Sequence, residues 1–324
     1  MTIGVIGGGA WGTALAQVAA EGDDVLLWAR EPDVVDGINR ARENIVFLPG
    51  VPLSPAIRAT PALSDLAGCA MLLVVPPAQY LRTVLGELPQ MDRPLILCSK
   101  GLEAGTRKLM SDVAAEVHPR APIAVLSGPT FAHEVAARLP AAVTLACCDE
   151  AIGRALAEQI AQPFFRPYLS TDVIGAEIGG AVKNVLAIAC GIVDGRGLGQ
   201  NARAALISRG FAEMTRFGLA KGARAETLAG LSGLGDLVLT CSSVSSRNFS
   251  LGVGIGQGRA AAELLADRKS VAEGAFTAPV LQQAARDVGV DMPVVDAVCA
   301  LLGGEAAVDE VIGGLLARPI RTEA

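Results

Sequence analysis

The sequence has few aromatic residues and very few histidines, and both shortages restrict its chemistry. Aromatic residues make up only 4% of the 324 residues, so valine, leucine, isoleucine and alanine must fill the core. Two histidines, His118 and His133, exclude a zinc site built from several histidines and argue against a histidine-based catalytic triad. His118 precedes Pro119 and is predicted to lie in a surface loop. We expect no resident metal ion.

The chain also lacks a basic block and an uninterrupted membrane-type hydrophobic run. Its net charge is −6, and lysine and arginine are scattered along it, which argues against a nucleic-acid partner. The most apolar stretch, residues 173–193, contains Glu177, Lys183 and Asn184. Charged groups are costly inside a bilayer, so this stretch is predicted to be a buried helix, and no stable membrane insertion is expected.

The cysteine pattern favours a reducing compartment. There are seven cysteines, which is an odd number, and no C-x-x-C motif occurs. The adjacent Cys147 and Cys148 are poorly placed to bridge each other. A predicted strand begins almost at the first residue, and no signal peptide is visible. The expected location is therefore the cytoplasm, with most thiols acting as small core residues.

A glycine-rich turn near the start carries the strongest signal. Gly7, Gly9 and Gly12 form a G-x-G-x-x-G pattern between an apolar run, Ile3–Ile6, and a predicted helix over Thr13–Ala20. In a dinucleotide site the first glycine permits the turn, the second admits the pyrophosphate, and the third allows close helix–strand packing. The helix N-terminus then directs free N–H groups at the negative charge. The alternative is an ordinary glycine turn.

The end of the next predicted strand bears on the choice of cofactor. The apolar segment Asp24–Ala29 ends at Arg30, about 20 residues beyond the glycines, where NAD-specific sites usually carry Asp or Glu. An arginine fork suits a 2′-phosphate. NADP(H) is therefore the preferred cofactor, although the neighbouring Glu31 leaves NAD(H) possible and Arg30 could simply be a solvated side chain.

The order of apolar segments predicts an α/β fold with two domains. Residues 1–178 alternate strands with helical segments, as in a Rossmann-type doubly wound, mainly parallel sheet. Residues 179–324 are predicted to form an all-helical domain that binds substrate. The predicted strands are Ile3–Ile6, Val25–Trp28, Met71–Val75, Leu95–Cys98, Ile123–Leu126 and Ala142–Ala146, and the predicted helices of the second domain are Val182–Val193, Ala202–Gly218, Ser245–Gly258 and Ala278–Val288.

Two isolated charges in apolar segments are candidates for proton chemistry. Lys183 lies in an apolar helix behind Gly179 and Gly180, which leave room for something to approach. Burial lowers the pKa of a lysine toward the range useful for proton transfer. Asp236 is its candidate partner. The alternatives are a snorkelling lysine and an aspartate that caps a helix.

Further cations stand where a phosphate could bind. Ser246 is a candidate helix cap followed by Arg247 in the first turn, where a helix dipole disfavours a cation unless an anion is bound. Lys100 directly follows a predicted strand, at the edge of the sheet where ligands bind. Either side chain could instead be an ordinary solvated cation.

Long motifs along nearly the whole chain resemble the bacterial NAD(P)-dependent sn-glycerol-3-phosphate dehydrogenases. The matching stretches are Gly7–Ala14, Ser99–Glu103, Ser127–Val135, Gly175–Asp194, Asn201–Gly210, Gly233–Cys241, Ser245–Asn248 and Val271–Ala278. The resemblance implies reversible hydride transfer between NAD(P)H and dihydroxyacetone phosphate, which gives sn-glycerol 3-phosphate for glycerophospholipid synthesis. It also implies a homodimer.

The resemblance assigns roles to individual residues. Lys183 resembles the family's proton donor and acceptor, and Asp236 resembles the acid beside it. Lys100 is the third predicted catalytic residue. The substrate-side residues it implies are Lys100, Gly128, Thr130, Lys183, Asp236, Ser246, Arg247 and Asn248. The cofactor-side residues it implies are Gly7, Gly9, Ala10, Trp11, Gly12, Arg30, Phe47, Lys100, Ala132, Arg247, Val271 and Glu273.

Two other functions compete with this interpretation. A lysine-dependent 3-hydroxyacid or 6-phosphogluconate-type dehydrogenase would share the lysine and asparagine at 183 and 184, but not the stretches 233–241 and 245–248 in this form. A catalytically inactive NADP(H) sensor would need the glycine turn alone. It would not need Lys183, Asp236 and Arg247 together.

Overall fold

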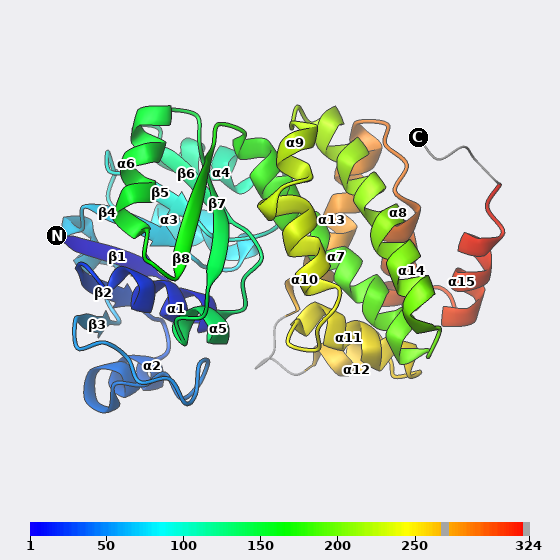
Figure 1. Ribbon diagram of the computed structural model, residues 1–324, viewed down its shortest axis with the longest axis horizontal. Coiled ribbons are helices and arrows are strands. Elements are labelled where there is room, and N and C mark those ends of the chain that lie inside the picture. Colours follow the sequence, from blue (N-terminus) through cyan, green and yellow to red (C-terminus); the bar gives the residue numbers. More distant parts are fainter. Residues whose placement is uncertain (267–271, 320–324) are drawn as a thin grey trace.

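The computed structural model describes residues 1–266 and 272–319, and it places a sheet half beside a helical half. Figure 1 shows the sheet on the left and the helices on the right, with the first strand pointing from the N-terminus toward the helical half. The predicted fold class, a Rossmann-type sheet followed by an all-helical part, is confirmed.

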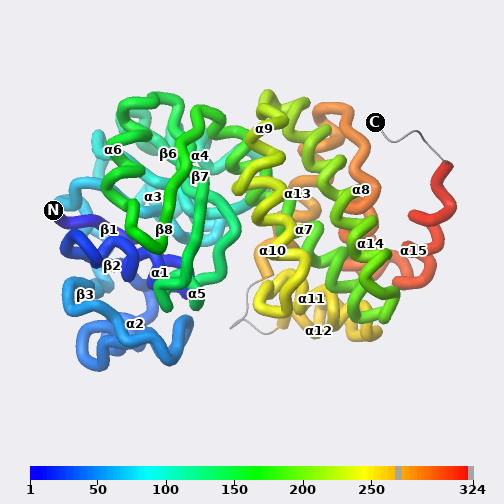
Figure 2. The backbone as a smooth tube through the Cα atoms, viewed as in Figure 1, coloured from blue at the N-terminus to red at the C-terminus, as the bar shows by residue number. Residues whose placement is uncertain are grey.

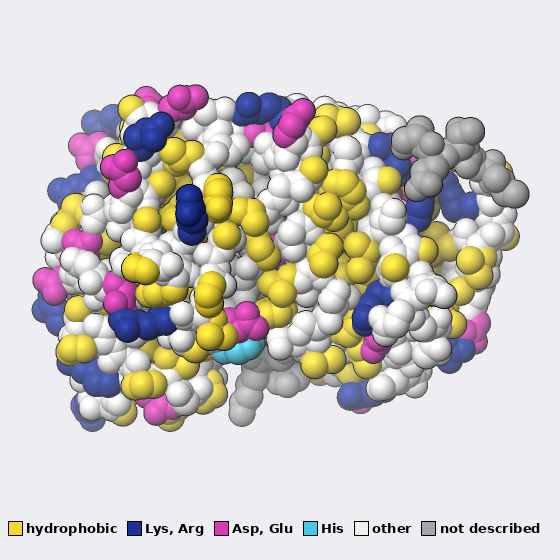
Figure 3. Space-filling model, in the orientation of Figure 1, with side chains coloured by type: hydrophobic (Ala, Val, Ile, Leu, Met, Phe, Trp, Pro, Cys, Tyr) yellow, Lys and Arg dark blue, Asp and Glu magenta, His cyan; other side chains and the backbone are white. Residues whose placement is uncertain are grey.

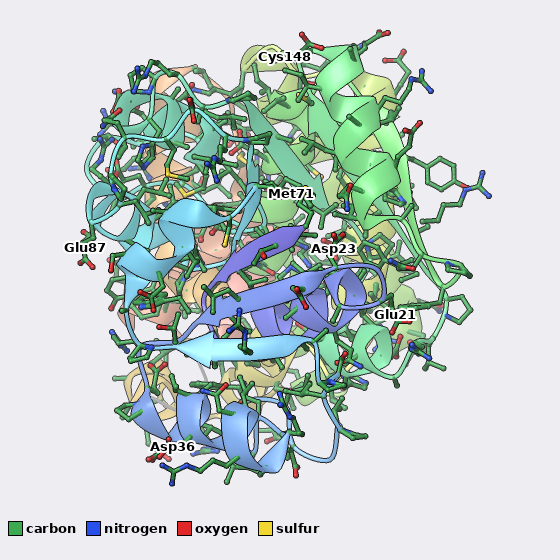
Figure 4. All side chains as sticks on the ribbon, turned by 90° about the vertical axis from the view of Figure 1, so that its left-hand side faces the viewer. Glu21, Asp23, Asp36, Met71, Glu87 and Cys148 are labelled. Carbon is green, nitrogen blue, oxygen red and sulfur yellow. The ribbon has the colours of Figure 1, made fainter. Side chains whose placement is uncertain are left out.

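The sheet has eight strands in the order β3-β2-β1-β4-β5-β6-β7-β8. Neighbours pair in parallel except β6 and β7, so the last two strands run opposite to the first six. The strands are β1 Thr2–Ile6, β2 Asp24–Trp28, β3 Ile57–Thr60, β4 Met71–Val74, β5 Leu95–Leu97, β6 Ile123–Ser127, β7 Ala141–Cys147 and β8 Phe165–Ser170. Figure 4 shows the end of this sheet away from the helical half, with Met71 labelled where β4 begins.

Six strands lie where the sequence predicts them, to within one residue at either end, and the two edge strands were not predicted. β3 has only four residues and exposes Arg58, so its apolar pattern is short. β8 contains Pro167, which cannot donate a ladder hydrogen bond and is tolerated on an edge strand. Neither segment has the continuous apolar run of a strand that is buried on both faces.

Helices cover both faces of the sheet. They are α1 Ala10–Ala19, α2 Pro32–Asp36, α3 Leu81–Gly86, α4 Met110–Val117, α5 Ala132–Ala136 and α6 Glu150–Ile160. Side chains from α1, α5 and α6 share one apolar core with Ile3 and Val5 of β1. Those of α3 and α4 share the core on the other face with Ile6, as the period of two along a strand requires.

One long helix, α7 (Val173–Gly195), lies at the centre of the helical half, and most of its residues are buried. Figure 2 follows the chain from β8 into this helix. The other helices are α8 Gly199–Ala220, α9 Ala225–Leu228, α10 Asp236–Thr240, α11 Arg247–Gly256, α12 Ala261–Leu265, α13 Glu273–Asp287, α14 Pro293–Gly303 and α15 Val308–Leu316. By length and hydropathy α7 could span a membrane, but 89% of its most apolar window is buried within the protein, as in the core helix of a soluble fold.

Helix α7 confirms the buried helix predicted over residues 173–193, and it begins nine residues before Val182, the predicted start of the first helix of the second domain. Asp172 caps it, accepting a hydrogen bond from the N–H of Gly175 at 2.8 Å. The expected domain boundary after residue 178 therefore falls inside a continuous helix.

The two halves complete each other's cores. Val173 and Ala176, in the first turn of α7, belong to the apolar core beneath the sheet. In return Leu102 and Leu109, from the segment between β5 and α4, are buried in the core of the helical half. The halves are therefore interlocked through side chains.

His118 corrects the prediction of a surface loop. It ends α4 and is fully buried. Its Nδ1 accepts a hydrogen bond from the N–H of Met91 at 3.3 Å, and its Nε2 lies 3.0 Å from the carbonyl of Leu85. These contacts indicate a structural histidine with a proton on Nε2.

Glycines let α7 and α11 pack backbone to backbone. A Cβ at Gly191 would lie 2.0 Å from the carbonyl oxygen of Phe249, and one at Gly252 would lie 2.0 Å from that of Ile188. Because both obstacles are backbone atoms, no rotamer change can relieve them. The separation of the two helices therefore depends on these glycines.

Gly191→Ala is expected to force α7 and α11 apart and lower the free energy of unfolding by about 3 kcal/mol, as overpacking does. Gly314→Ala is the matched control, because no described atom lies within 4 Å of the added Cβ and alanine favours the helix. Urea unfolding of the two variants measures the difference. Equal stabilities would contradict close packing at Gly191.

Candidate active site

The site lies where the carboxyl ends of the parallel strands meet α7. The segments that follow β5 and β6 carry Lys100 and Gly128, and α7 presents Lys183 to them from the helical half. Ligands bind at this edge in open α/β sheets. The sequence predicted Lys100 at this edge, and in the structure Lys100 and Lys183 converge on Asp236 there.

A single carboxylate joins the two lysines. Lys183 Nζ donates a hydrogen bond to Asp236 Oδ1 at 2.6 Å, and Lys100 Nζ donates one to Asp236 Oδ2 at 2.6 Å. Asp236 is fully buried, and the Lys183 side chain is only 7% exposed. The predicted pairing of Lys183 with Asp236 is present in the structure, and Asp236 does not act as a simple helix cap.

Burial and charge set the protonation of this cluster. Burial is the main cause that lowers the pKa of Lys183 to about 8. The attraction of Asp236 raises this pKa, and the repulsion from Lys100 partly offsets that effect. Burial alone would raise the pKa of Asp236, but the two ammonium groups outweigh it and lower that pKa. The result is an ionised carboxylate that holds an amine able to change protonation near neutral pH.

Glycines bring the parts of the cluster together. A Cβ at Gly179 would lie 2.2 Å from the carbonyl oxygen of Ser232, in the π-helical turn Leu231–Gly235 that leads into Asp236. A Cβ at Gly180 would lie 3.2 Å from Cγ of Lys100. The room that these glycines provide is therefore used by the protein itself, to bring α7 against the segments that carry Asp236 and Lys100.

Thr240 was missed by the sequence analysis. Its Oγ1 accepts a hydrogen bond from Lys183 Nζ at 2.9 Å and donates one to Asp236 Oδ1 at 3.2 Å. The available signal was its spacing, because residues four apart on a helix share a face and Asp236 and Thr240 are the two ends of α10.

The start of α11 has the predicted cap. Ser246 Oγ accepts a hydrogen bond from the N–H of Phe249 at 3.2 Å, and Arg247 is the exposed first residue of the helix. Asn248 Oδ1 accepts one from the N–H of Gly274 at 2.9 Å, which ties α11 to the start of α13. Arg247 therefore has an exposed position beside free backbone N–H groups.

The charges of three cations act on Glu273. Burial raises the pKa of its carboxyl group, and the nearby charges of Arg247, Lys100 and Lys183 act in the opposite direction. The structure thus brings Glu273, Arg247 and both lysines into one region. The remaining predicted residue of this region, Val271, lies outside the described residues.

The glycine turn has the shape that a dinucleotide requires. Gly7 has a φ of +116°, and a Cβ at Gly12 would lie 1.9 Å from the carbonyl oxygen of Gly7. No described atom lies within 4 Å of a Cβ at Gly9, so this side of the turn is open. Helix α1 begins at Ala10 without a side-chain cap, which leaves its first N–H groups available. The turn therefore fits a pyrophosphate.

The surrounding predicted residues are consistent with this fit. Trp11 Nε1 is buried and has no hydrogen-bond partner among the described residues. Phe47 and Ala132 are partly buried and pack against the same apolar core as Ala10 and Trp11. Gly12 packs directly against the carbonyl oxygen of Gly7 and so holds the turn in place.

The remaining predicted residues occupy two further edges of the site. Arg30 is exposed two residues beyond β2, and its guanidinium lies 3.1 Å from Glu31. A Cβ at Gly128 would lie 2.9 Å from Val143 Cα, and Thr130 Oγ1 donates a hydrogen bond to the Gly128 carbonyl at 3.3 Å. Glycine at 128 thus lets the end of β6 pass close to β7.

A hollow of about 890 Å³ between α6, β7, β8 and α9 lies elsewhere on the surface. None of the predicted site residues lines it. Within the described ranges, no cluster of three or more His, Cys, Asp or Glu side chains could hold a metal ion. The lysine–aspartate cluster therefore remains the candidate for chemistry.

Comparison with known proteins shows the family of the chain. Residues 2–153 match the N-terminal model, and residues 172–313 the C-terminal model, of NAD-dependent glycerol-3-phosphate dehydrogenase. The chain is 63% identical over 321 residues to glycerol-3-phosphate dehydrogenase [NAD(P)+] 1 of Sphingopyxis alaskensis, covering 99% of this chain and 97% of that protein. It is 61% identical to the Caulobacter vibrioides enzyme named glycerol-3-phosphate dehydrogenase [NAD(P)+], covering 99% and 98% of the two chains.

A solved structure extends the comparison to three dimensions. The crystal structure of glycerol-3-phosphate dehydrogenase from Coxiella burnetii superposes with a TM-score of 0.94 at 38% sequence identity, covering 98% of this chain and 99% of that one. D-mandelate dehydrogenase, at a TM-score of 0.65 and 14% identity, shares the fold alone.

Asp236→Asn is expected to lower the free energy of unfolding at pH 6 by about 3–5 kcal/mol, because two lysine charges then lose their buried partner. The loss should be smaller at pH 9, since without Asp236 the pKa of Lys183 falls further below about 8 and the amine becomes neutral. Urea unfolding at the two pH values measures both effects.

The control is Thr240→Val, which removes hydrogen bonds but no charge and should cost about 1 kcal/mol at either pH. A pH-independent loss in Asp236→Asn, or a loss no larger than that of the control, would exclude the buried charge cluster.

Proposed function

Because this chain belongs to the NAD-dependent glycerol-3-phosphate dehydrogenase family, we propose that the cluster of Lys183, Asp236 and Lys100 is where it performs that reaction. The protein is an NAD(P)-dependent oxidoreductase that interconverts dihydroxyacetone phosphate and sn-glycerol 3-phosphate. The observation that carries the assignment of the site is the buried carboxylate held between two ammonium groups at the carboxyl edge of the sheet.

Lys183 is the proposed proton donor and acceptor. The nicotinamide cofactor, when bound, supplies or accepts the hydride. During reduction, negative charge develops on the C2 oxygen of the substrate, and a protonated Lys183 stabilises that charge and delivers the proton. During oxidation, neutral Lys183 accepts the hydroxyl proton. A pKa of about 8 makes both protonation states accessible.

Asp236, Thr240 and Lys100 prepare that amine. Asp236 and Thr240 fix the direction of Lys183 Nζ through bonds of 2.6 and 2.9 Å. Lys100 repels the Lys183 ammonium and so helps to lower its pKa. We propose that Lys100 also contacts substrate and cofactor, since its ammonium stands at the carboxyl edge of the sheet and shares Asp236 with Lys183.

The substrate phosphate is assigned to the start of α11. Arg247 and the free N–H groups of the helix's first turn can bind an anion. Ser246 and Asn248 fix this turn through the bonds described above, and Gly128 and Thr130 close the site from the sheet side. Binding energy from the phosphate would position the C2 carbonyl beside Lys183.

The cofactor is assigned to the glycine turn. Gly7, Gly9 and Gly12 would shape the pyrophosphate site, with Ala10 at the helix N-terminus. Trp11, Phe47, Ala132, Arg247, Val271 and Glu273 complete the proposed cofactor residues. Arg30 would bind the 2′-phosphate of NADP(H), and its neighbour Glu31 would suit the ribose hydroxyls of NAD(H).

We further propose a cytoplasmic homodimer that supplies sn-glycerol 3-phosphate for glycerophospholipid synthesis. Seven free cysteines support a reducing compartment. Figure 3 shows hydrophobic side chains gathered over the helical half. Leu219 of α8 and Val238 of α10 are about half exposed. Such exposed apolar side chains could form the contact between subunits. A solution mass of about two chains, measured by light scattering, is what the homodimer requires.

Lys183→Ala is expected to lower turnover of dihydroxyacetone phosphate by about 10²–10⁴-fold, because it removes the acid–base group. NADPH binding, measured by fluorescence, should persist. In the unmodified enzyme the rate of glycerol 3-phosphate oxidation should rise as the pH passes through about 8, where Lys183 loses its proton, and the variant should lack this rise.

Near-normal turnover in Lys183→Ala would overturn the role of the amine. Turnover of 3-oxoacids instead of dihydroxyacetone phosphate by the unmodified enzyme would favour the other lysine-dependent dehydrogenases. Cofactor binding without any turnover would favour a sensor.

Arg30→Ala is expected to weaken NADPH use by about tenfold or more while leaving NADH use nearly unchanged, because only NADPH carries the 2′-phosphate that a charged hydrogen bond would recognise. Steady-state kinetics with both cofactors measure this ratio. Arg58→Ala, which removes an exposed arginine from the neighbouring β3, is the control and should leave the ratio unaltered. An unchanged ratio in Arg30→Ala would remove the basis for NADP(H) preference.

A further inference from the structure

Besides Asp236 of α10, the site region has a second buried carboxylate, Glu177 of α7, which reaches from the helical half into the sheet half. Glu177 is 5% exposed. Its Oε1 accepts a hydrogen bond from the backbone N–H of Ser111 at 2.8 Å, and its Oε2 accepts one from Ser111 Oγ at 2.5 Å. One side chain of the catalytic helix therefore binds both donors of a residue that follows β5.

Glu177 supplies a cap that α4 itself does not have. The residue before α4 is Leu109, whose side chain cannot accept a hydrogen bond, and Ser111 lies in the first turn, where backbone N–H groups need partners. A carboxylate is favoured there by the helix dipole. Burial nevertheless raises the pKa of Glu177 to about 7, with the bonds from Ser111 acting in the opposite direction, so this charge is costly to keep.

The capped helix ends the segment that carries Lys100. Residues 98–109 run from the end of β5 to the start of α4. At the beginning of this segment the Lys100 stem lies against Gly180 of α7, and at its end Ser111 is held by Glu177 of the same helix. Between them Leu102 and Leu109 are buried in the helical core.

The outer side of the segment is also held. The Gln79 side chain donates a hydrogen bond to the carbonyl of Leu102 and accepts one from the N–H of Ala104, both at 2.8 Å. Glu103 accepts hydrogen bonds from Arg82 at 2.7 and 2.9 Å. These contacts make the segment between Lys100 and α4 stiff. A shift of α4 relative to α7 would therefore also shift Lys100.

We propose that Glu177 is a positioning residue for the reaction, because its bond to Ser111 holds the Lys100 segment in register with Lys183 on the same helix. This inference rests on the proposed function of Lys100 and Lys183. Glu177 touches neither lysine in the structure's hydrogen bonds, so its effect passes through the backbone. A shift of about 1 Å between reacting groups can lower a rate by about a hundredfold.

The chain contains a matched control for this proposal. Glu213 of α8 is also a buried carboxylate, 3% exposed, and it caps α14 through the N–H groups of Val294 and Val295 at 2.8 and 3.4 Å. Burial raises its pKa to about 7, as for Glu177. Glu213 joins two helices of the helical half, however, and has no contact with the Lys100 segment.

The test compares Glu177→Ala with Glu213→Ala in the full-length enzyme. Both should lower the melting temperature, because each uncaps a helix. Only Glu177→Ala should lower kcat, by about ten- to a hundredfold, with NADPH affinity within about twofold of normal because the glycine turn is not touched. Glu177→Gln should restore most of kcat, since its amide can accept from the Ser111 N–H and donate to Ser111 Oγ.

Coupling to Lys100 gives an independent measurement. In a Lys100→Met background, Glu177→Ala should lower kcat by less than about twofold further, because the group that it positions is already absent. If Glu177→Ala does not fold, Glu177→Asp, whose carboxylate is one methylene short of Ser111, takes its place.

The positioning role of Glu177 and the proposed reaction are refuted by different results. Equal kcat losses in the Glu177 and Glu213 variants, an unchanged kcat in Glu177→Ala or Glu177→Asp, or fully additive losses with Lys100→Met would each refute the positioning role while leaving the reaction intact. No turnover of dihydroxyacetone phosphate by the unmodified enzyme would refute the proposed function, and this inference with it.

Discussion

The structure depends on keeping one fully buried carboxylate, Asp236, between two lysines that come from different halves of the molecule. An isolated charge in such a place would be strongly destabilising, so each member of the cluster needs the others. Lys100 lies in the segment after β5, Lys183 lies on the central helix α7, and Asp236 is the first residue of α10. The arrangement of the two halves is thus fixed by an electrostatic requirement as much as by apolar packing.

Close backbone approach is what makes this convergence possible. Gly179 admits the turn before Asp236, Gly180 admits the stem of Lys100, and Gly191 admits the backbone of α11. A side chain at any of these positions would move α7 away from a neighbour that carries a site residue. The glycines of α7 therefore permit close packing of its neighbours. The helix tolerates the low helix propensity of glycine because other elements enclose it.

Much of the fold was predictable because its signals are local. Parallel strands buried on both faces show continuous apolar runs, and the glycine turn shows its spacing directly. The edge strands β3 and β8 have no such runs. The pairing of Lys183 with Asp236 was predictable as two isolated charges in apolar surroundings. The contacts of Thr240, Glu177 and His118 were not, because each depends on which segments meet after folding. The role of Glu177 in particular exists only once the first turn of α4 meets α7.

The exchange of core residues between the halves has a consequence for how the chain matures. Leu102 and Leu109 are synthesised well before the helices that bury them, and Val173 and Ala176 belong to a helix whose remaining turns need partners made later still. A nascent N-terminal half emerging from the ribosome would carry uncovered leucines and an unfilled gap beneath its sheet. Complete burial of these four side chains therefore requires helices that are synthesised last.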